Sequence, residues 1–172
     1  PNVTLNSRFG PSRGHNRSGA ILGKAMVTGS ETIIPFAFDA ETFTPPNTIS
    51  SSHFCRGVFI SRDFGRTWQF ERISDQFGCV PALCQTAGYL YYFAGPVPLW
   101  FSRKASNAEA WESPKPITKT SHGFDAFYGV AGGGDTAHIC WMDRRHNKWR
   151  FSFDEPAPVN SDIYYRRRKD GD

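Results

Sequence analysis

The sequence predicts an all-β protein built from short antiparallel strands. Its apolar runs are brief, aromatic residues make up 15% of the chain, and 16 glycines and 12 prolines separate the runs. No window shows a long helical period with capping residues, so little helix is expected. The strand-like runs recur in three stretches of roughly 40 to 60 residues, which indicates a repeat architecture.

Size and charge limit the function classes. A chain of 172 residues suits one domain, and its net charge of +4 is mild. That charge allows an anionic ligand such as an acidic sugar and does not call for nucleic acid. No apolar run approaches the roughly 20 residues of a membrane helix, so no membrane span is expected. The chain begins at Pro1 without a signal peptide, as a mature product or a fragment would, and nothing in it calls for a cofactor.

The cysteines and two glycosylation sequons bear on the compartment. Two disulfides with three possible pairings, or four free thiols, are compatible with Cys55, Cys79, Cys84 and Cys140. No matching Cys/His pair follows Cys79 and Cys84, so no metal site is expected. The sequons at Asn2 and Asn16 fit an extracellular or periplasmic, secreted protein.

The first repeat is expected to be a four-stranded meander. Residues 1–19 are polar and predict an irregular approach segment, and Gly29-Ser30 is typical of a hairpin turn. Residues 39–52 predict a long polar loop. The expected strands are Ala20–Val27, Thr32–Phe38, Arg56–Ser61 and Trp68–Ile73.

Two further repeats follow. The second spans about residues 80–118, and its last turn keeps only Ser102 and Trp111 of the pattern described next. The third spans about residues 127–172, with a turn at 132–135 and an insertion at 143–159. Repeats of this length with four short strands each are typical of β-propeller blades.

The stretch from Val58 to Trp68 predicts a hairpin that its own side chains hold together. Its first three residues are apolar and can form a buried strand. The Asp63 carboxylate can accept hydrogen bonds from backbone N–H groups in a tight turn, and Gly65 supplies a positive φ. Trp68 can then fold back under the turn and bury a large apolar area.

This stretch resembles the Asp-box of sialidases and related β-propellers, although an ordinary hairpin is the alternative. The resemblance rests on the spacing of Ser61, Asp63, Gly65, Thr67 and Trp68. In that family the box lies on the outer rim of a blade and does no chemistry. The C-terminal residues resemble a second box cut short. There Asp170 falls where Asp63 stands, but Arg168 and Asp172 replace the Ser and the Gly.

The expected architecture is an all-β set of about three four-stranded antiparallel blades, at about 20–73, 80–118 and 127–172, within residues 20–172. The resemblance implies that they form part of a six-bladed sialidase-like propeller. Three blades do not close a ring and would leave strand edges exposed. The remaining blades would therefore come from missing sequence or from a second copy.

The resemblance also implies candidate site residues. Sialidases grip the sugar carboxylate with three arginines, use an Asp on an early loop as acid/base, and use a Tyr with a Glu as nucleophile. Arg17 precedes the first inner strand and corresponds to the first arginine, or is a surface cation. Asp39 is the candidate catalytic acid and Glu41 its alternative, or both are solvated loop charges. The late Tyr and Glu cannot be placed.

A second candidate binding cluster lies in the insertion. Arg144, Arg145 and Trp149 could hold an anionic sugar and stack on its apolar face. The rival interpretation is that Asp143 pairs with an arginine and ties the insertion down. The basic run 166–169 indicates a charged face beside a turn, and nothing else favours nucleic acid.

Two function classes therefore stand side by side. The first is a sialidase-like protein that acts on or binds glycans, and any enzyme activity would be that of a sialidase-type glycoside hydrolase. The second is a non-catalytic binding or scaffold propeller, secreted or on a cell surface, possibly an oligomeric lectin. Fold analogy does not choose between them.

Overall fold

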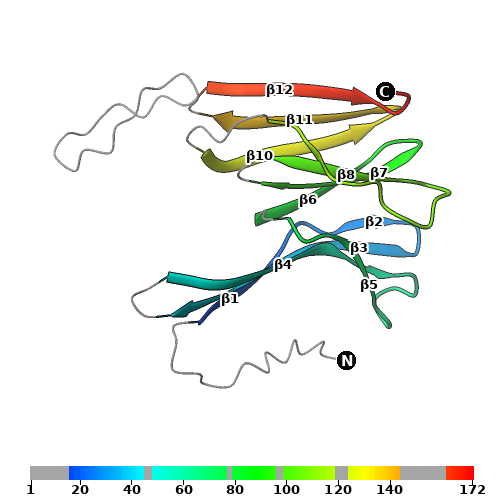
Figure 1. Cartoon of the computed structure of the whole chain (residues 1–172). Helices are drawn as coiled ribbons and strands as arrows, with labels where there is room; N and C mark the ends of the chain where they lie inside the picture. The colour runs from blue at the N-terminus through cyan, green and yellow to red at the C-terminus, as the bar shows by residue number, and fades with distance from the viewer. Residues whose placement is uncertain (1–15, 45–47, 77–78, 96–98, 119–123, 144–161) are drawn as a thin grey trace. The chain divides into compact units, whose positions relative to one another are not determined.

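The chain is all-β over the residues that its computed structural model describes, which are 16–44, 48–76, 79–95, 99–118, 124–143 and 162–172 (Figure 1). Within these residues the strands form three antiparallel sheets, so the expected fold class is confirmed at the level of an all-β protein. The chain divides into two compact units, Pro1–Phe77 and Gly78–Asp172. Each is described by itself below.

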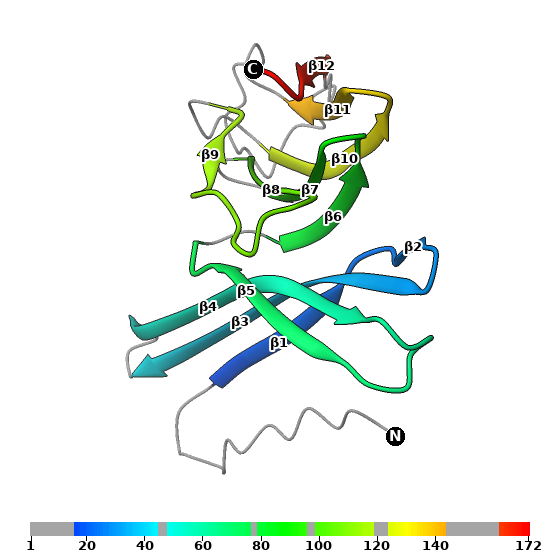
Figure 2. The same cartoon turned by 90° about the vertical axis from the view of Figure 1, so that its right-hand side faces the viewer.

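The first unit holds one sheet with the strand order β1-β3-β4-β5, in which β2 also pairs with β3 (Figure 2). Its strands are β1 (Asn16–Leu22), β2 (Met26–Thr28), β3 (Glu31–Thr44), β4 (Thr48–Ser61) and β5 (Gln69–Ser74). The expected turn between β2 and β3 is present, with φ +60 at Gly29. Glycine adopts this left-handed conformation without steric cost.

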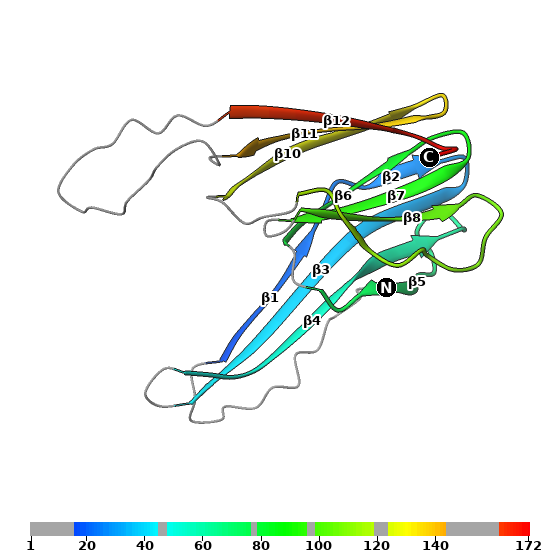
Figure 3. The same cartoon turned by 45° about the horizontal axis from the view of Figure 1, so that its top comes forward.

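The structure corrects the long loop expected at residues 39–52. Strand β3 continues to Thr44 and β4 begins at Thr48, and the two pair along an extended hairpin (Figure 3). The polar composition of residues 39–52 is typical of a loop. However, Thr42, Phe43 and Thr44 favour extended backbone, and the neighbouring strand pairs with their backbone N–H and C=O groups. Similarly, β1 begins at Asn16, inside the segment expected to be irregular, and pairs with β3.

The first unit has one face of buried aliphatic side chains and one face of aromatic side chains. The buried aliphatic residues are Ile33, Ala37, Val58 and Ile60. They alternate along β3 and β4 as the period of a strand requires. On the other face the ring of Phe36 lies edge-on to Phe59 and Phe70, with centroids 5.2 and 5.8 Å away. Such edge-to-face pairs add to the stabilisation from burial.

The second unit holds two sheets. The first has the order β6-β7-β8-β9, with β6 (Cys79–Gln85), β7 (Tyr89–Gly95), β8 (Trp100–Ala105) and β9 (Lys115–Pro116). The second has the order β10-β11-β12, with β10 (Phe124–Gly133), β11 (Thr136–Asp143) and β12 (Asp162–Lys169). The third expected repeat thus shows three strands within the described residues, where four were expected.

The two sheets of the second unit share one hydrophobic core. Its buried members are Cys84, Tyr91, Phe93, Leu99 and Phe101 from the first sheet side, and Ala137, Ile139 and Trp141 from β11. Tyr128 reinforces the contact, because its hydroxyl donates to the carbonyls of Val80 and, at 3.2 Å, Phe93. Two sheets packed in this way are consistent with a β-sandwich or with neighbouring propeller blades.

Candidate functional site

The turn at residues 61–68 is held by its own side chains, as its sequence predicts. One carboxylate oxygen of Asp63 accepts from the Ser61 hydroxyl at 2.9 Å and from the Thr67 backbone N–H at 2.8 Å. The other accepts from the Thr67 hydroxyl at 2.6 Å. The Gly65 N–H donates to the Ser61 hydroxyl at 2.7 Å, and the Trp68 indole N–H donates to the Gly65 carbonyl at 3.2 Å.

These contacts fix both the charge and the backbone of the turn. Hydrogen bonds from the Thr67 hydroxyl and backbone N–H lower the pKa of Asp63 below its usual value. Gly65 has φ +84, in the region that favours glycine, and Phe64 has φ 57 with its side chain 80% exposed. The polar side chains of Ser61, Asp63 and Thr67 are therefore engaged in bonds within the turn.

The two early site candidates lie two rungs apart in one sheet. Arg17 in β1 is paired with Glu41 in β3, and Asp39 in β3 is paired with Gly19 and, on its other side, with Phe54. The structure therefore brings Arg17 and Asp39 within two residues along one strand pair. Their side chains lie outside the described residues, so their assignment as ligand and acid stays a prediction.

The second cluster of candidates is not described. Arg144, Arg145 and Trp149 lie outside the described residues, and their assignment as sugar ligands stays a prediction. Asp143, which precedes them, ends β11 and pairs through its backbone register with Phe124 and Asp162.

Asp170 follows β12 and bonds to a different turn from its own. Its carboxylate accepts from the Thr86 hydroxyl at 2.7 Å, the Gly88 N–H at 2.9 Å and the Tyr91 hydroxyl at 3.3 Å. Its backbone N–H donates to the Asp135 carbonyl at 2.8 Å. Asp170 therefore connects the end of β12 to the turn between β6 and β7.

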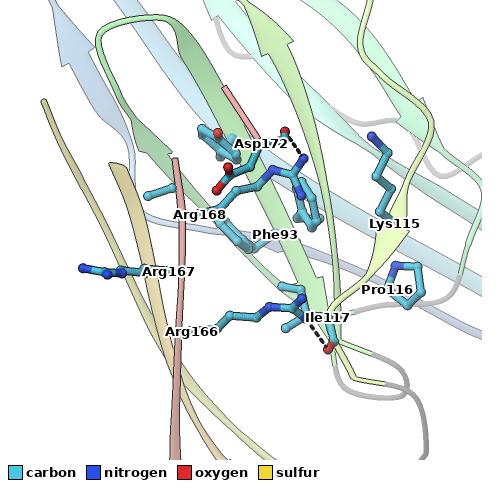
Figure 4. A pocket seen from close by; sticks show the side chains of 11 residues that line it. Phe93, Lys115, Pro116, Ile117, Arg166, Arg167, Arg168 and Asp172 are labelled. Atoms are coloured by element: carbon cyan, nitrogen blue, oxygen red, sulfur yellow. Dashed lines mark hydrogen bonds between the residues drawn. The ribbon is translucent and has the colours of Figure 1, made fainter. Parts of the chain in front are cut away.

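A cavity of about 340 Å³ lies between the two sheets of the second unit, and cationic residues of β9 and β12 contribute to its lining (Figure 4). We call it the cationic groove. Its polar lining consists of Lys115, Arg166, Arg167, Arg168 and Asp172, and its apolar lining of Tyr91, Phe93, Phe101, Pro116, Ile117 and Ala137. The side chains of Arg166 and Arg168 point toward the other lining residues, whereas that of Arg167 points away (Figure 4). With Lys115, three positive side chains against the one carboxylate of Asp172 make the lining cationic.

Two arginines of β12 reach toward β8 and β9. Arg166 donates to the Ile117 carbonyl at 3.2 Å, and Arg168 donates to the Asp172 carbonyl (Figure 4). The Arg168 guanidinium lies over the Phe101 ring, 5.3 Å from its centroid. Its buried Nε–H has no acceptor among the described residues. Each guanidinium carries five donors, so both keep donors beyond these contacts.

An ion-pair cluster supports the opposite wall of the groove. Glu112 accepts from Arg103 at 2.8 Å and from Lys115 at 2.9 Å. Partial burial acts to raise the pKa of Glu112, but the bonds from Lys115 and Arg103 lower it overall. Arg103 also lies over the Tyr89 ring at 4.3 Å and donates to the Asp170 carbonyl at 3.2 Å. The cluster thus connects β8, β9 and the end of β12.

The sequence indicates only a charged face at residues 166–169, and it gives no signal for Lys115. Arg166 and Lys115 come from different sheets, so no local pattern places them together. Alternation is the one signal in the sequence, because Arg166 and Arg168 are two residues apart and share one side of an extended strand.

The described residues also bear on metal binding, membrane insertion and thiol chemistry. No group of three His, Cys, Asp or Glu side chains in that part of the chain could hold a metal ion. No helix in the same residues is long and apolar enough to cross a membrane. Cys55, Cys84 and Cys140 are free thiols, and the side chain of Cys79 is not described.

No protein-family model, curated protein or solved structure matches the chain.

Proposed function

We propose that this protein binds an anionic glycan in the cationic groove and does not hydrolyse it. The observation that carries the proposal is the pairing of guanidinium groups with apolar rings around one cavity of about 340 Å³. That volume is at the lower end of ligand pockets, which span about 300–1,000 Å³. It suits one or two sugar rings.

The chemistry of the lining favours a carboxylated sugar. Arg166 and Arg168 present planar donor forks that suit the two oxygens of a carboxylate. Phe93 and Phe101 provide rings against which the C–H face of a sugar can pack. A ligand with one anionic group and one apolar face would match both halves of the groove.

Binding is favoured over hydrolysis by the state of the one tyrosine in the lining. Tyr91 is 1% exposed, and burial raises the pKa of its hydroxyl. Because that hydroxyl is buried and its pKa is raised, it is poorly exposed to a bound sugar and seldom ionised, which makes it a poor nucleophile. Among the described lining residues Asp172 is the one carboxylate, whereas glycoside hydrolysis generally uses a pair of acidic groups.

The proposal extends to the family of the fold. We propose that the turn at 61–68 is an Asp-box and that the three sheets are propeller blades of a sialidase-like protein. The contacts of Ser61, Asp63, Thr67 and Trp68 support this, because each residue of the motif makes an internal bond of the turn. In that case further blades, from additional sequence or a second copy, would complete the ring, and the protein would be secreted.

The direct test is isothermal titration with a sialic acid glycoside and with the matching neutral galactoside. We expect saturable binding of the acidic sugar alone. Arg168→Gln should weaken binding about tenfold or more, because a hydrogen bond to a charged group contributes about 1.5–3 kcal/mol and 1.4 kcal/mol is tenfold. A fluorogenic sialoside should show no turnover.

The matched control is Arg72→Gln, which removes the same charge from an exposed arginine paired with Asp75 in the first unit. Equal loss of affinity in both variants would show a net-charge effect and would overturn the assignment of the groove. Binding of a single-stranded oligonucleotide in preference to the sugar would point to nucleic acid instead. Measurable turnover would overturn the claim of binding without hydrolysis.

A further inference from the structure

Arg166, Arg168 and Asp170 lie at alternate positions at the end of β12. Arg166 and Arg168 are two residues apart in extended backbone, so they project to the same side, and Asp170 follows them in the turn after β12. Their strand partners Ile139 and Ala137 on β11 are buried members of the core, so this side faces the other sheet. The arginines line the groove, and the aspartate bonds to the first sheet.

The carboxylate of Asp170 accepts hydrogen bonds from three donors, and we call it the anchor. Two of them belong to the turn that joins β6 and β7, namely the Thr86 hydroxyl and the Gly88 N–H. The third is the Tyr91 hydroxyl, and Tyr91 itself lines the groove. The fit is close, because a side-chain carbon added at Gly88 would lie 2.9 Å from the Asp170 carboxylate.

The anchor lies next to the groove and outside its lining. It is separated by one residue from Arg168, whose guanidinium lies over Phe101. A strand end that moves by about 1 Å changes the geometry of a bidentate contact enough to lose most of it. The three bonds to Asp170 therefore determine where the donors of Arg168 lie relative to the ring of Phe101.

We propose that Asp170 is a positioning residue, which sets the location of the groove arginines and so raises the affinity for the anionic ligand without touching it. This inference rests on the proposed function of the groove. It predicts that anion affinity changes in the direction opposite to the one expected from charge alone. Removal of a negative charge beside a cationic site should strengthen anion binding by electrostatics alone, whereas loss of a positioning carboxylate should weaken it.

The test compares Asp170→Asn with Asp135→Asn in the whole chain, by titration with the sialic acid glycoside. Asp135 is exposed, bonds through its carboxylate to Thr136 at 2.7 Å, and lies in the turn that receives the Asp170 N–H. Both variants remove one negative charge from adjoining turns. We expect about tenfold weaker binding for Asp170→Asn and unchanged or slightly tighter binding for Asp135→Asn.

A double-mutant cycle with Arg168→Gln separates positioning from a general loss of structure. If Asp170 acts through Arg168, Asp170→Asn should cost little further affinity once Arg168 is replaced. Full additivity, or tighter binding by Asp170→Asn, would overturn the proposal. If Asp170→Asn does not fold, the variant Thr86→Val, which removes one of the three donors, takes the place of Asp170→Asn in the same cycle.

A measurement without ligand keeps this proposal distinct from the proposed function. Amide hydrogen exchange of β12 should accelerate in Asp170→Asn and remain unchanged in Asp135→Asn. If the wild-type chain binds no acidic sugar but this pattern holds, the proposed function fails and the anchoring of β12 stands. If the exchange rate of β12 is the same in all three proteins, the assignment of Asp170 as a positioning residue is wrong, regardless of which ligand binds.

Discussion

Gly132 provides the sharpest test of how the two sheets of the second unit meet. A side-chain carbon built at this glycine of β10 would lie 2.0 Å from the Gln85 carbonyl oxygen and 2.7 Å from its carbon. Both are backbone atoms of β6, so no side-chain rotation can relieve the overlap. Gly132→Ala therefore requires β10 to move away from β6, which would also loosen the core below them.

We expect Gly132→Ala to destabilise the protein by about 1–3 kcal/mol, the usual range for overpacking. For a chain of this size 1 kcal/mol lowers Tm by about 2–4 °C, so Tm should fall by about 2–12 °C. Thermal melting followed by near-UV circular dichroism measures the change, and urea unfolding gives the free energy. Affinity for an acidic sugar should fall in parallel, because the groove lies between the same sheets.

The neighbouring glycine is the matched control. A side-chain carbon at Gly133 would meet no atom within 4 Å, and its φ is not in the left-handed region. Gly133→Ala should therefore be neutral or stabilise the protein by up to about 1 kcal/mol through the unfolded state. If the two variants unfold within about 0.5 kcal/mol of each other, β10 does not approach β6 as described.

Three further predictions concern the turn at 61–68 and the thiols. Asp63 has a lowered pKa, so its stabilisation is present above its ordinary value of 3.8 and is lost as pH falls through the lower folded value. The difference in Tm between wild type and Asp63→Asn should thus be largest at about pH 7 and should disappear at about pH 2. A difference in Tm that persists in acid would contradict this reasoning. Gly65→Ala places a side chain at φ +84 and should cost about 1–3 kcal/mol in thermal melts, and a neutral result would mean that the turn tolerates other backbone angles. Burial raises the pKa of Cys84 to about 12, so iodoacetamide should modify exposed Cys140 in the native protein, and Cys84 only after unfolding, as peptide mass spectrometry would show.

Local signals in the sequence predicted local structure well. The all-β class followed from short apolar runs, and the contacts of the turn at 61–68 followed from residues that are at most seven positions apart. The error at residues 39–52 has the opposite cause. Their polar composition is compatible with a loop, but pairing with the neighbouring strand satisfies the backbone, and that partner is not visible in a local window.

The cationic groove could not be predicted because its walls come from distant parts of the chain. Arg166 donates to the carbonyl of Ile117, which lies 49 residues away. The register between the sheets decides which cations share a cavity, and no short pattern encodes it. The same applies to Asp170, whose spacing suggested a bond within its own turn, whereas its carboxylate bonds to Thr86, 84 residues earlier.

The turn at 61–68 divides its side chains into two sets. The polar groups of the first set, Ser61, Asp63 and Thr67, make bonds within the turn. The second set, Phe64 and Arg66, is exposed to solvent, with Phe64 80% exposed. Because the conformation depends on the first set, Arg66 can change identity at little conformational cost, whereas Phe64, at φ 57, favours residues that tolerate left-handed backbone. The loop is therefore a natural place to graft a fluorophore, an epitope or a recognition peptide onto a rigid base.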